Sequence, residues 1–222
     1  MSQGIRQKVV MKMKREGILV VISGFAGAGK GTIVKELMNR YDNYALSVSM
    51  TTRQPRVGEV DGVSYFFVSK EDFEKNIAAD GFVEHACYCD NYYGTPKSYV
   101  EKQLADGKDV ILEIEIQGAL KIKELYPTAL LLFVMPPSAQ ELRKRLIGRG
   151  TETMEVVNKR MNRAAQEADG IEQYDYIVVN DTIEVCVQDT HSIIEAAHAK
   201  PIRNEALIRT VREELKRMAK GE

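Results

Sequence analysis

The feature that most constrains the fold is an apolar strand pattern that runs directly into a glycine-rich turn. Residues 18–23 (ILVVIS) form an apolar, β-branched run, residues 24–30 fit the pattern G-x-x-x-x-G-K, and residues 31–39 have a helical pattern. Glycines let successive N–H groups point at one anion, and the helix N-terminus adds positive charge. This strand–loop–helix order predicts a binding loop for the phosphates of a nucleoside triphosphate, with a merely glycine-rich turn as the alternative.

The residue after the lysine of this loop departs from the usual pattern. Ser or Thr is expected directly after the lysine, but Gly31 stands there and the hydroxyl comes one position later, at Thr32. Because Mg²⁺ gives up its water reluctantly, we expect Thr32 to reach a magnesium ion through water rather than directly. The residues predicted to hold the triphosphate are Gly24, Phe25, Ala26, Gly27, Ala28, Gly29, Lys30, Gly31 and Thr32.

Three further apolar runs, at residues 109–116, 129–135 and 176–180, alternate with helical patterns. This alternation predicts an α/β fold with a parallel sheet covered on both faces. Residues 60–68 and 82–93 are rich in aromatic, β-branched and turn residues, which predicts an inserted, partly antiparallel segment. Ser138 and Glu141 form a capping-box pattern that begins a basic helix–loop–helix, which we expect to act as a mobile lid.

The chain end carries an amphipathic pattern. Leu207, Ile208, Val211, Leu215 and Met218 share one helical face within residues 202–220. We expect this helix to pack on the body, with a dimer contact as the alternative.

Composition excludes several classes of protein. The 222 residues contain 31 Lys and Arg against 32 Asp and Glu, so the net charge of −1 provides no general attraction to nucleic acid or membranes. Cys87, Cys89 and Cys186 lack the spacing of a metal site. The start of the chain lacks the apolar stretch of a signal peptide, and no apolar run approaches the ~18 residues of a membrane span. We therefore expect a cytoplasmic protein.

Two arginines flank a proline in the segment 47–59. Pro55 keeps the preceding residue out of the helical region, so Arg53 and Arg56 are carried on an irregular turn. Paired guanidinium forks suit a phosphate dianion. The segment predicts a second phosphate site, with a solvated surface loop as the alternative.

Glu113 and Glu115 lie two apart near the end of an otherwise apolar run. On a strand, their side chains share one face, where an unpaired charge is costly to bury. Ligands of open α/β sheets bind outside the carboxyl ends of strands. We therefore expect both carboxylates beside the acceptor base and ribose or near water on Mg²⁺, unless this is an edge strand turned to solvent.

The order of these motifs resembles the guanylate kinase family from residue 17 to residue 200. The resemblance rests on S-V-S-x-T-T-R-x-P-R-x-G-E at 47–59 and on segments 61–67, 82–84, 91–95, 112–118, 136–138, 148–153 and 179–181. It implies a three-layer P-loop kinase fold with a parallel central sheet, an inserted mixed α+β GMP-binding subdomain and a helical lid. It also implies transfer of phosphate from Mg·ATP to GMP or dGMP in purine nucleotide metabolism and GMP recycling.

The resemblance assigns roles to individual residues. It implies that lid arginines stabilise the charge of the transferring group. The implied catalytic residues are Lys30, Arg53, Arg145, Arg149 and Arg160. The implied GMP-binding residues are Ser49, Arg53, Arg56, Glu59, Tyr65, Glu84, Tyr93, Thr95, Glu113 and Glu115. Asn180 and Arg149 are implied at the adenine end of ATP.

Glu84 has a chemical reason of its own to select guanine. Guanine presents N1–H and the exocyclic amine as adjacent donors, whereas adenine presents an acceptor at N1. A carboxylate here therefore discriminates against AMP, because a buried polar group left unsatisfied costs about 1–3 kcal/mol and more when charged. An exposed acid on an inserted strand is the alternative.

The predicted units are a P-loop core (17–49, 97–137 and 171–200), a GMP-binding subdomain (50–96), a lid (138–170), a basic N-terminal extension (1–16) and a C-terminal helical tail (201–222). We expect a monomer or a homodimer. Two other functions stay open, a catalytically silent interaction module and a kinase for AMP or UMP. The intact lysine and arginines argue against the first, and Glu84 with Ser49 argues against an AMP kinase.

Overall fold

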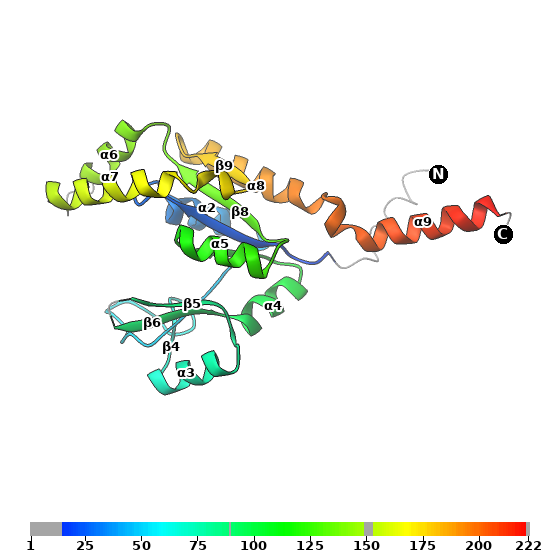
Figure 1. Ribbon diagram of the computed structural model, residues 1–222, viewed down its shortest axis with the longest axis horizontal. Helices are drawn as coiled ribbons and strands as arrows, with labels where there is room; N and C mark the ends of the chain where they lie inside the picture. Colours follow the sequence, from blue (N-terminus) through cyan, green and yellow to red (C-terminus); the bar gives the residue numbers. More distant parts are fainter. Residues whose placement is uncertain (1–14, 89, 149–152, 221–222) are drawn as a thin grey trace.

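The computed structural model describes residues 15–88, 90–148 and 153–220 (Figure 1). Within these ranges, the core is a five-stranded parallel sheet with the order β2-β7-β1-β8-β9. The predicted α/β fold and parallel sheet are confirmed. The strands are β1 (Leu19–Gly24), β2 (Tyr44–Leu46), β7 (Asp109–Glu113), β8 (Leu130–Met135) and β9 (Tyr176–Val179).

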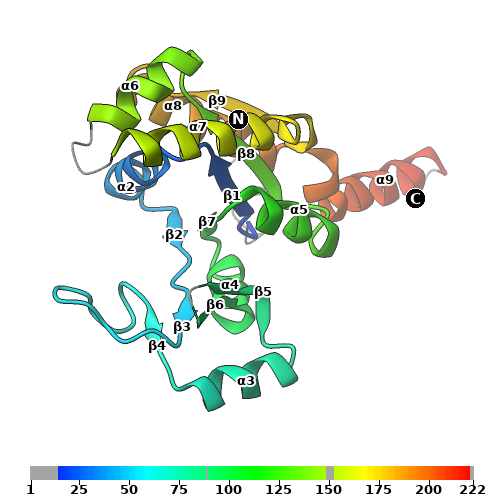
Figure 2. The same ribbon diagram turned by 60° about the vertical axis from the view of Figure 1, so that its left-hand side comes forward.

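The central position of β1 follows from its sequence. All six of its residues are buried, and the facing residues of β8 are buried as well, so both strands need helices on each side. Helices α2 and α8 contact each other, and α5 lies across the sheet from α2 (Figures 1 and 2). The covering helices are α2 (Lys30–Arg40), α4 (Lys97–Ala105), α5 (Ile116–Leu125) and α8 (Ile183–His198).

The inserted segment forms a separate lobe beside the core (Figure 1). Its sheet has the order β4-β3-β6-β5, with one parallel and two antiparallel pairings, so the partly antiparallel prediction is confirmed. Phe73 is fully buried and stacks on Phe82 and Tyr92, which gives the inserted lobe a small core of its own. Its elements are β3 (Met50–Thr51), β4 (Phe66–Phe67), α3 (Lys70–Ala78), β5 (Phe82–Tyr88) and β6 (Asn91–Pro96).

The predicted lid contains α6 (Ala139–Gly148) and α7 (Met154–Ala168). Ser138 Oγ accepts a hydrogen bond from Glu141 N at 3.1 Å, as the capping pattern predicts. Leu142 and Leu146 of α6 and Val157 of α7 are buried in the main core. Both helices are therefore anchored to the body through one face.

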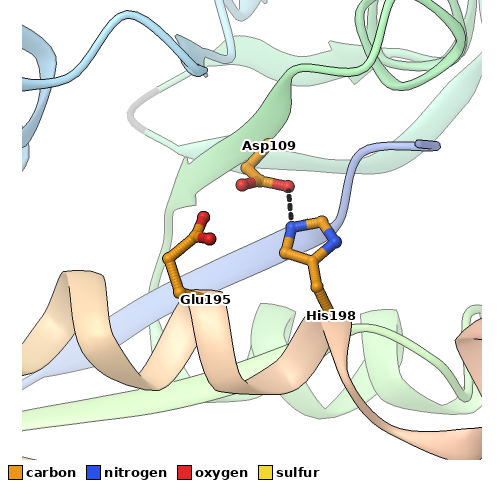
Figure 3. Close-up of side chains that lie close together, drawn as sticks. All are labelled: Asp109, Glu195 and His198. Atoms are coloured by element: carbon orange, nitrogen blue, oxygen red, sulfur yellow. Dashed lines mark hydrogen bonds and ion pairs between the residues drawn. The ribbon is translucent and has the colours of Figure 1, made fainter. Parts of the chain in front are cut away.

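A polar cluster fastens α8 to the amino edge of the sheet (Figure 3). Asp109 is buried at the start of β7, and its Oδ1 accepts hydrogen bonds from Ile18 N and His198 Nε2, both at 2.8 Å. Glu195, one turn before His198, pairs with Arg15 at 2.8 Å. Protein groups already donate hydrogen bonds to both acids, so we interpret the cluster as a structural contact that holds α8 to the sheet.

The C-terminal helix corrects one prediction. Helix α9 (Glu205–Ala219) forms, but it extends away from the body and none of its residues is buried (Figure 1). The expectation that it packs on the body is wrong, because the apolar side chains of its stripe are exposed along its length. Among the described residues, no helix combines the length and apolar character needed to cross a bilayer.

Candidate active site

The phosphate loop lies between β1 and α2, where the sequence pattern places it. Gly29 is the N-cap residue of α2, and its φ of 95° lies in the left-handed region. A Cβ on Gly24 would come within 2.0 Å of Val134 O, so only glycine fits where β1 passes β8. The loop backbone is thus fixed by its own glycines.

Lys30 folds back over this loop. Its Nζ donates to Gly24 O at 2.7 Å and lies 3.4 Å from Phe25 O. The amide N–H groups of Gly27, Gly29 and Gly31 donate to no other group in the described part of the chain. Open amides beside an ammonium group form an anion site at the N-terminus of a helix.

Two buried residues support the loop from the core. Asn180 follows β9 and is only 7% exposed, and its Nδ2 donates to Ala28 O at 2.8 Å. A Cβ on Gly27 would lie 2.9 Å from Leu146 Cδ2, so α6 packs directly beneath the turn. The side-chain amide of Asn180 is therefore engaged in holding the loop, and its contact with adenine stays a prediction.

Glu113 ends β7, beside the start of α2. β7 and β1 are neighbours, with Ile22 opposite Glu113, so the carboxylate reaches the edge of the sheet where the phosphate loop begins. A Cβ on Gly31 would lie 3.6 Å from Glu113 Oε2. The pKa of Glu113 is raised by desolvation, and the charge of Lys30 opposes this shift only in part. Thr32 is exposed in the first turn of α2, two residues after Lys30.

The expected placement of Glu115 on the same strand face as Glu113 is wrong. β7 stops at Glu113, and Glu115 is the N-cap residue of α5. The Ser23 hydroxyl donates to Ile114 O at 2.8 Å, which fixes the peptide before Glu115. The carboxylate of Glu115 instead meets Arg163 of α7.

Four predicted acceptor residues gather in the inserted lobe. Arg53 Nη2 donates to both carboxylate oxygens of Glu59, at 2.7 and 3.0 Å. The guanidinium lies 5.5 Å from the centre of the Tyr65 ring, which contacts the Tyr93 ring at 6.0 Å. Glu59, and also Tyr93, raise the pKa of Arg53. Arg56 contributes only its backbone N–H to Glu59, at 2.7 Å, and its side chain is exposed.

Glu84 and Thr95 form the other half of the predicted acceptor site. They face each other across the β5–β6 pair, and Thr95 Oγ1 donates to Glu84 Oε1 at 3.0 Å. Thr95 is 1% exposed. Burial raises the pKa of Glu84, and the hydrogen bond from Thr95 opposes that shift. Helix α5 contacts β5, so the strand that carries Glu84 borders the core.

The remaining predicted residues are placed separately. Ser49 is half-buried just before β3. Arg145 of α6 donates to Glu141 at 2.9 Å, and Arg160 is half-buried on α7. Arg149 lies outside the described residues.

Arg163 of α7 is a residue that the sequence analysis does not single out. It donates to Glu167 Oε1 at 2.8 Å and to Glu115 Oε2 at 3.1 Å. The spacing of four residues predicts the first contact. The second spans 48 residues, so no local pattern indicates it.

The arrangement defines the class of protein. A parallel sheet with a phosphate loop between β1 and α2, an inserted lobe and two arginine-bearing helices is the P-loop nucleotide kinase fold. The guanylate kinase family model matches residues 16–197, so the chain belongs to the guanylate kinase family.

Individual relatives agree with this membership. The guanylate kinase of Halalkalibacterium halodurans is 52% identical over 187 residues, which cover 84% of this chain and 92% of that protein. The guanylate kinase of Caldanaerobacter subterraneus subsp. tengcongensis is 48% identical over 204 residues, covering 92% and 99% of the two chains. The crystal structure of guanylate kinase from Anaplasma phagocytophilum matches with a TM-score of 0.66 and 34% identity, covering 86% of this chain and 90% of that one.

Proposed function

We propose that this family member is an active guanylate kinase, which transfers the γ-phosphoryl group of ATP to GMP and forms ADP and GDP. The hydrogen bond between the half-buried Glu84 and the buried Thr95 is the observation that carries the choice of acceptor. A carboxylate held by a threonine hydroxyl accepts hydrogen bonds from N1–H and the amine of guanine, and it repels the N1 acceptor of adenine. We further propose that the protein is cytoplasmic and that it is a monomer or a homodimer. We also propose that dGMP is a second acceptor.

The donor binds at the phosphate loop in this proposal. The open amides of the loop take the phosphate oxygens, and Lys30 exchanges its two carbonyl contacts for the β and γ phosphates. Asn180 keeps the loop in shape from below. Because Asn180 and Leu146 hold the loop in place, little ordering is required when the donor binds.

The acceptor phosphate binds at Arg53 and its aromatic neighbours. Glu59 holds the guanidinium of Arg53 in a fixed direction. Tyr65 and Tyr93 add hydroxyl groups beside it, and the exposed Arg56 can turn toward a bound phosphate. Two guanidinium forks then face one dianion.

Transfer needs positioning and charge more than covalent chemistry. Arg145 and Arg160, together with Arg149, are proposed to stabilise the charge on the transferring group. The donor set beside the loop fits Mg²⁺, because Glu113 and Thr32 offer a carboxylate and a hydroxyl oxygen at the start of α2. When bound, Mg²⁺ neutralises β- and γ-phosphate oxygens, and these two residues would hold it through water.

The test is a coupled assay of ADP formation with ATP and each of GMP, dGMP, AMP, UMP and CMP. We expect turnover with GMP and dGMP and little with the other three. Activity with AMP and not with GMP would overturn the acceptor assignment. No turnover with any of the five would favour a silent interaction module.

The rival function of a silent module is disfavoured by one geometric fact. Such a module has no need to keep a loop whose lysine and open amides converge, and here Asn180 and Leu146 hold that loop in place. These contacts support an active kinase over a silent module.

A further inference from the structure

Arg163 projects from the lid helix α7 to Glu115, which the family resemblance implies at the GMP site. Arg163 Nη2 lies 3.1 Å from Glu115 Oε2, and Arg163 Nε lies 2.8 Å from Glu167 Oε1. Glu167 is four residues further along α7, and its side chain is only 15% exposed. One guanidinium therefore joins a half-buried acid of the lid to the acid that begins α5.

The surroundings of this triad are fixed. Ser23, the fully buried residue near the end of β1, donates its hydroxyl to Ile114 O, so the backbone that carries Glu115 is tied to the sheet. Burial, followed by the charges of Glu167 and Glu115, raises the pKa of Tyr174 to about 12, which places both acids near the same buried phenol. Arg163 thus sits between two acids on anchored backbone.

We propose that Arg163 is a positioning residue that orients Glu115 for the guanine of the acceptor; this inference rests on the proposed function of Glu115. A carboxylate has two oxygens, and Arg163 engages Oε2. In the described residues, Oε1 of Glu115 has no hydrogen-bond donor, so it remains able to accept from a base. Arg163 therefore leaves Glu115 competent to bind guanine and removes much of its rotational freedom.

The link also connects acceptor binding to the lid. Arg160, one of the proposed transfer arginines, lies three residues before Arg163 on α7, so the two occupy neighbouring positions on the helix surface. Arg163 therefore ties the acceptor carboxylate to the helix that carries Arg160.

The size of the effect follows from exposure. The side chains of Arg163 and Glu115 are 62% and 69% exposed, so the pair is a surface ion pair whose loss changes affinity by about 3- to 5-fold. The effect should shrink as salt is raised from about 0.05 to 0.5 M, because exposed charges are screened.

The experiment is a double-mutant cycle on the full chain. The dissociation constants of GMP and of ATP are measured by calorimetry for wild type, R163A, E115A and R163A/E115A, and kcat and KM are measured for each. Lys159→Ala removes another exposed charge from α7 and serves as the matched control. R163K, which keeps the charge but loses the two-pronged geometry, should give an intermediate result.

We expect R163A to raise the dissociation constant and KM for GMP by about 3- to 5-fold, with kcat and ATP affinity within twofold of wild type. E115A should weaken GMP more, and R163A should add nothing in the E115A background. An R163A effect that is absent, or equal in both backgrounds, overturns the positioning role alone. Wild-type GMP affinity in E115A overturns the guanine assignment of Glu115 and this inference with it.

Discussion

The phosphate loop and the acceptor lobe solve the problem of placing charged groups in different ways. The loop is part of the main core, with Gly29 packed against Asn180 and Gly27 against Leu146. The acceptor lobe has a separate aromatic core, and its charged groups are held by one another, as in the pairing of Arg53 with Glu59. The donor site is therefore rigid with the sheet, whereas the acceptor site can be damaged independently.

The largest expected effect separates the two regions at the level of folding. Phe73 is fully buried in the acceptor lobe, so Phe73→Ala should destabilise that lobe by about 3–5 kcal/mol. GMP binding should be lost while ATP binding stays close to wild type, as measured by calorimetry for each nucleotide. Loss of ATP binding to the same extent would show that the two regions fold as one unit.

The next effect concerns the donor side alone. Lys30→Ala removes the ammonium from the loop and should lower kcat by about 10²–10³-fold, because a charge that stabilises the transferring group is lost. Lys35→Ala, on the exposed side of α2, is the matched control and should leave kcat near wild type. A similar kcat for both variants would contradict the role of the loop.

Glu84 gives a pH test of the acceptor side. Burial raises its pKa above the ordinary value of 4.5, so the carboxylate is protonated, and guanine affinity lost, as pH falls through that raised pKa. Glu84→Gln should weaken GMP by about 10- to 100-fold near neutral pH and remove this acid limb. Steady-state KM for GMP measured across pH checks both, and an unchanged acid limb in E84Q would assign it to another group.

The smallest expected effect is on stability and concerns the Asp109–His198 contact, at the edge of the sheet opposite the phosphate loop. His198→Ala leaves Asp109 buried with one hydrogen bond fewer and should cost about 1–3 kcal/mol of unfolding free energy in urea. Glu195→Gln weakens only an exposed pair with Arg15 and should cost about 1 kcal/mol or less. Equal costs would contradict the view that the buried contact is the one that anchors α8.

Sequence patterns predicted the local features of both regions. The sequence alone predicts β1, the phosphate loop and α2, because glycine spacing and apolar runs involve residues that are neighbours in the chain. Glu84 and Thr95 were named through the family resemblance, and the structure places them in contact.

The failures share a physical cause. The alternating run at residues 109–116 looks like one strand, but Glu115 already caps α5, because apolar alternation does not mark where a strand gives way to a helix. The stripe on α9 predicts an apolar face and not its partner, and the helix stands away from the body. Arg163 meets an acid 48 residues away, which only the fold brings near.

The central claim is that donor and acceptor bind at separate sites. Calorimetric titration of GMP into wild type, Lys30→Ala and Arg53→Ala tests it most directly. The account predicts GMP affinity within about twofold of wild type for K30A and a loss of about 10- to 100-fold for R53A, whose guanidinium holds the acceptor phosphate. Equal losses in the two variants would contradict it.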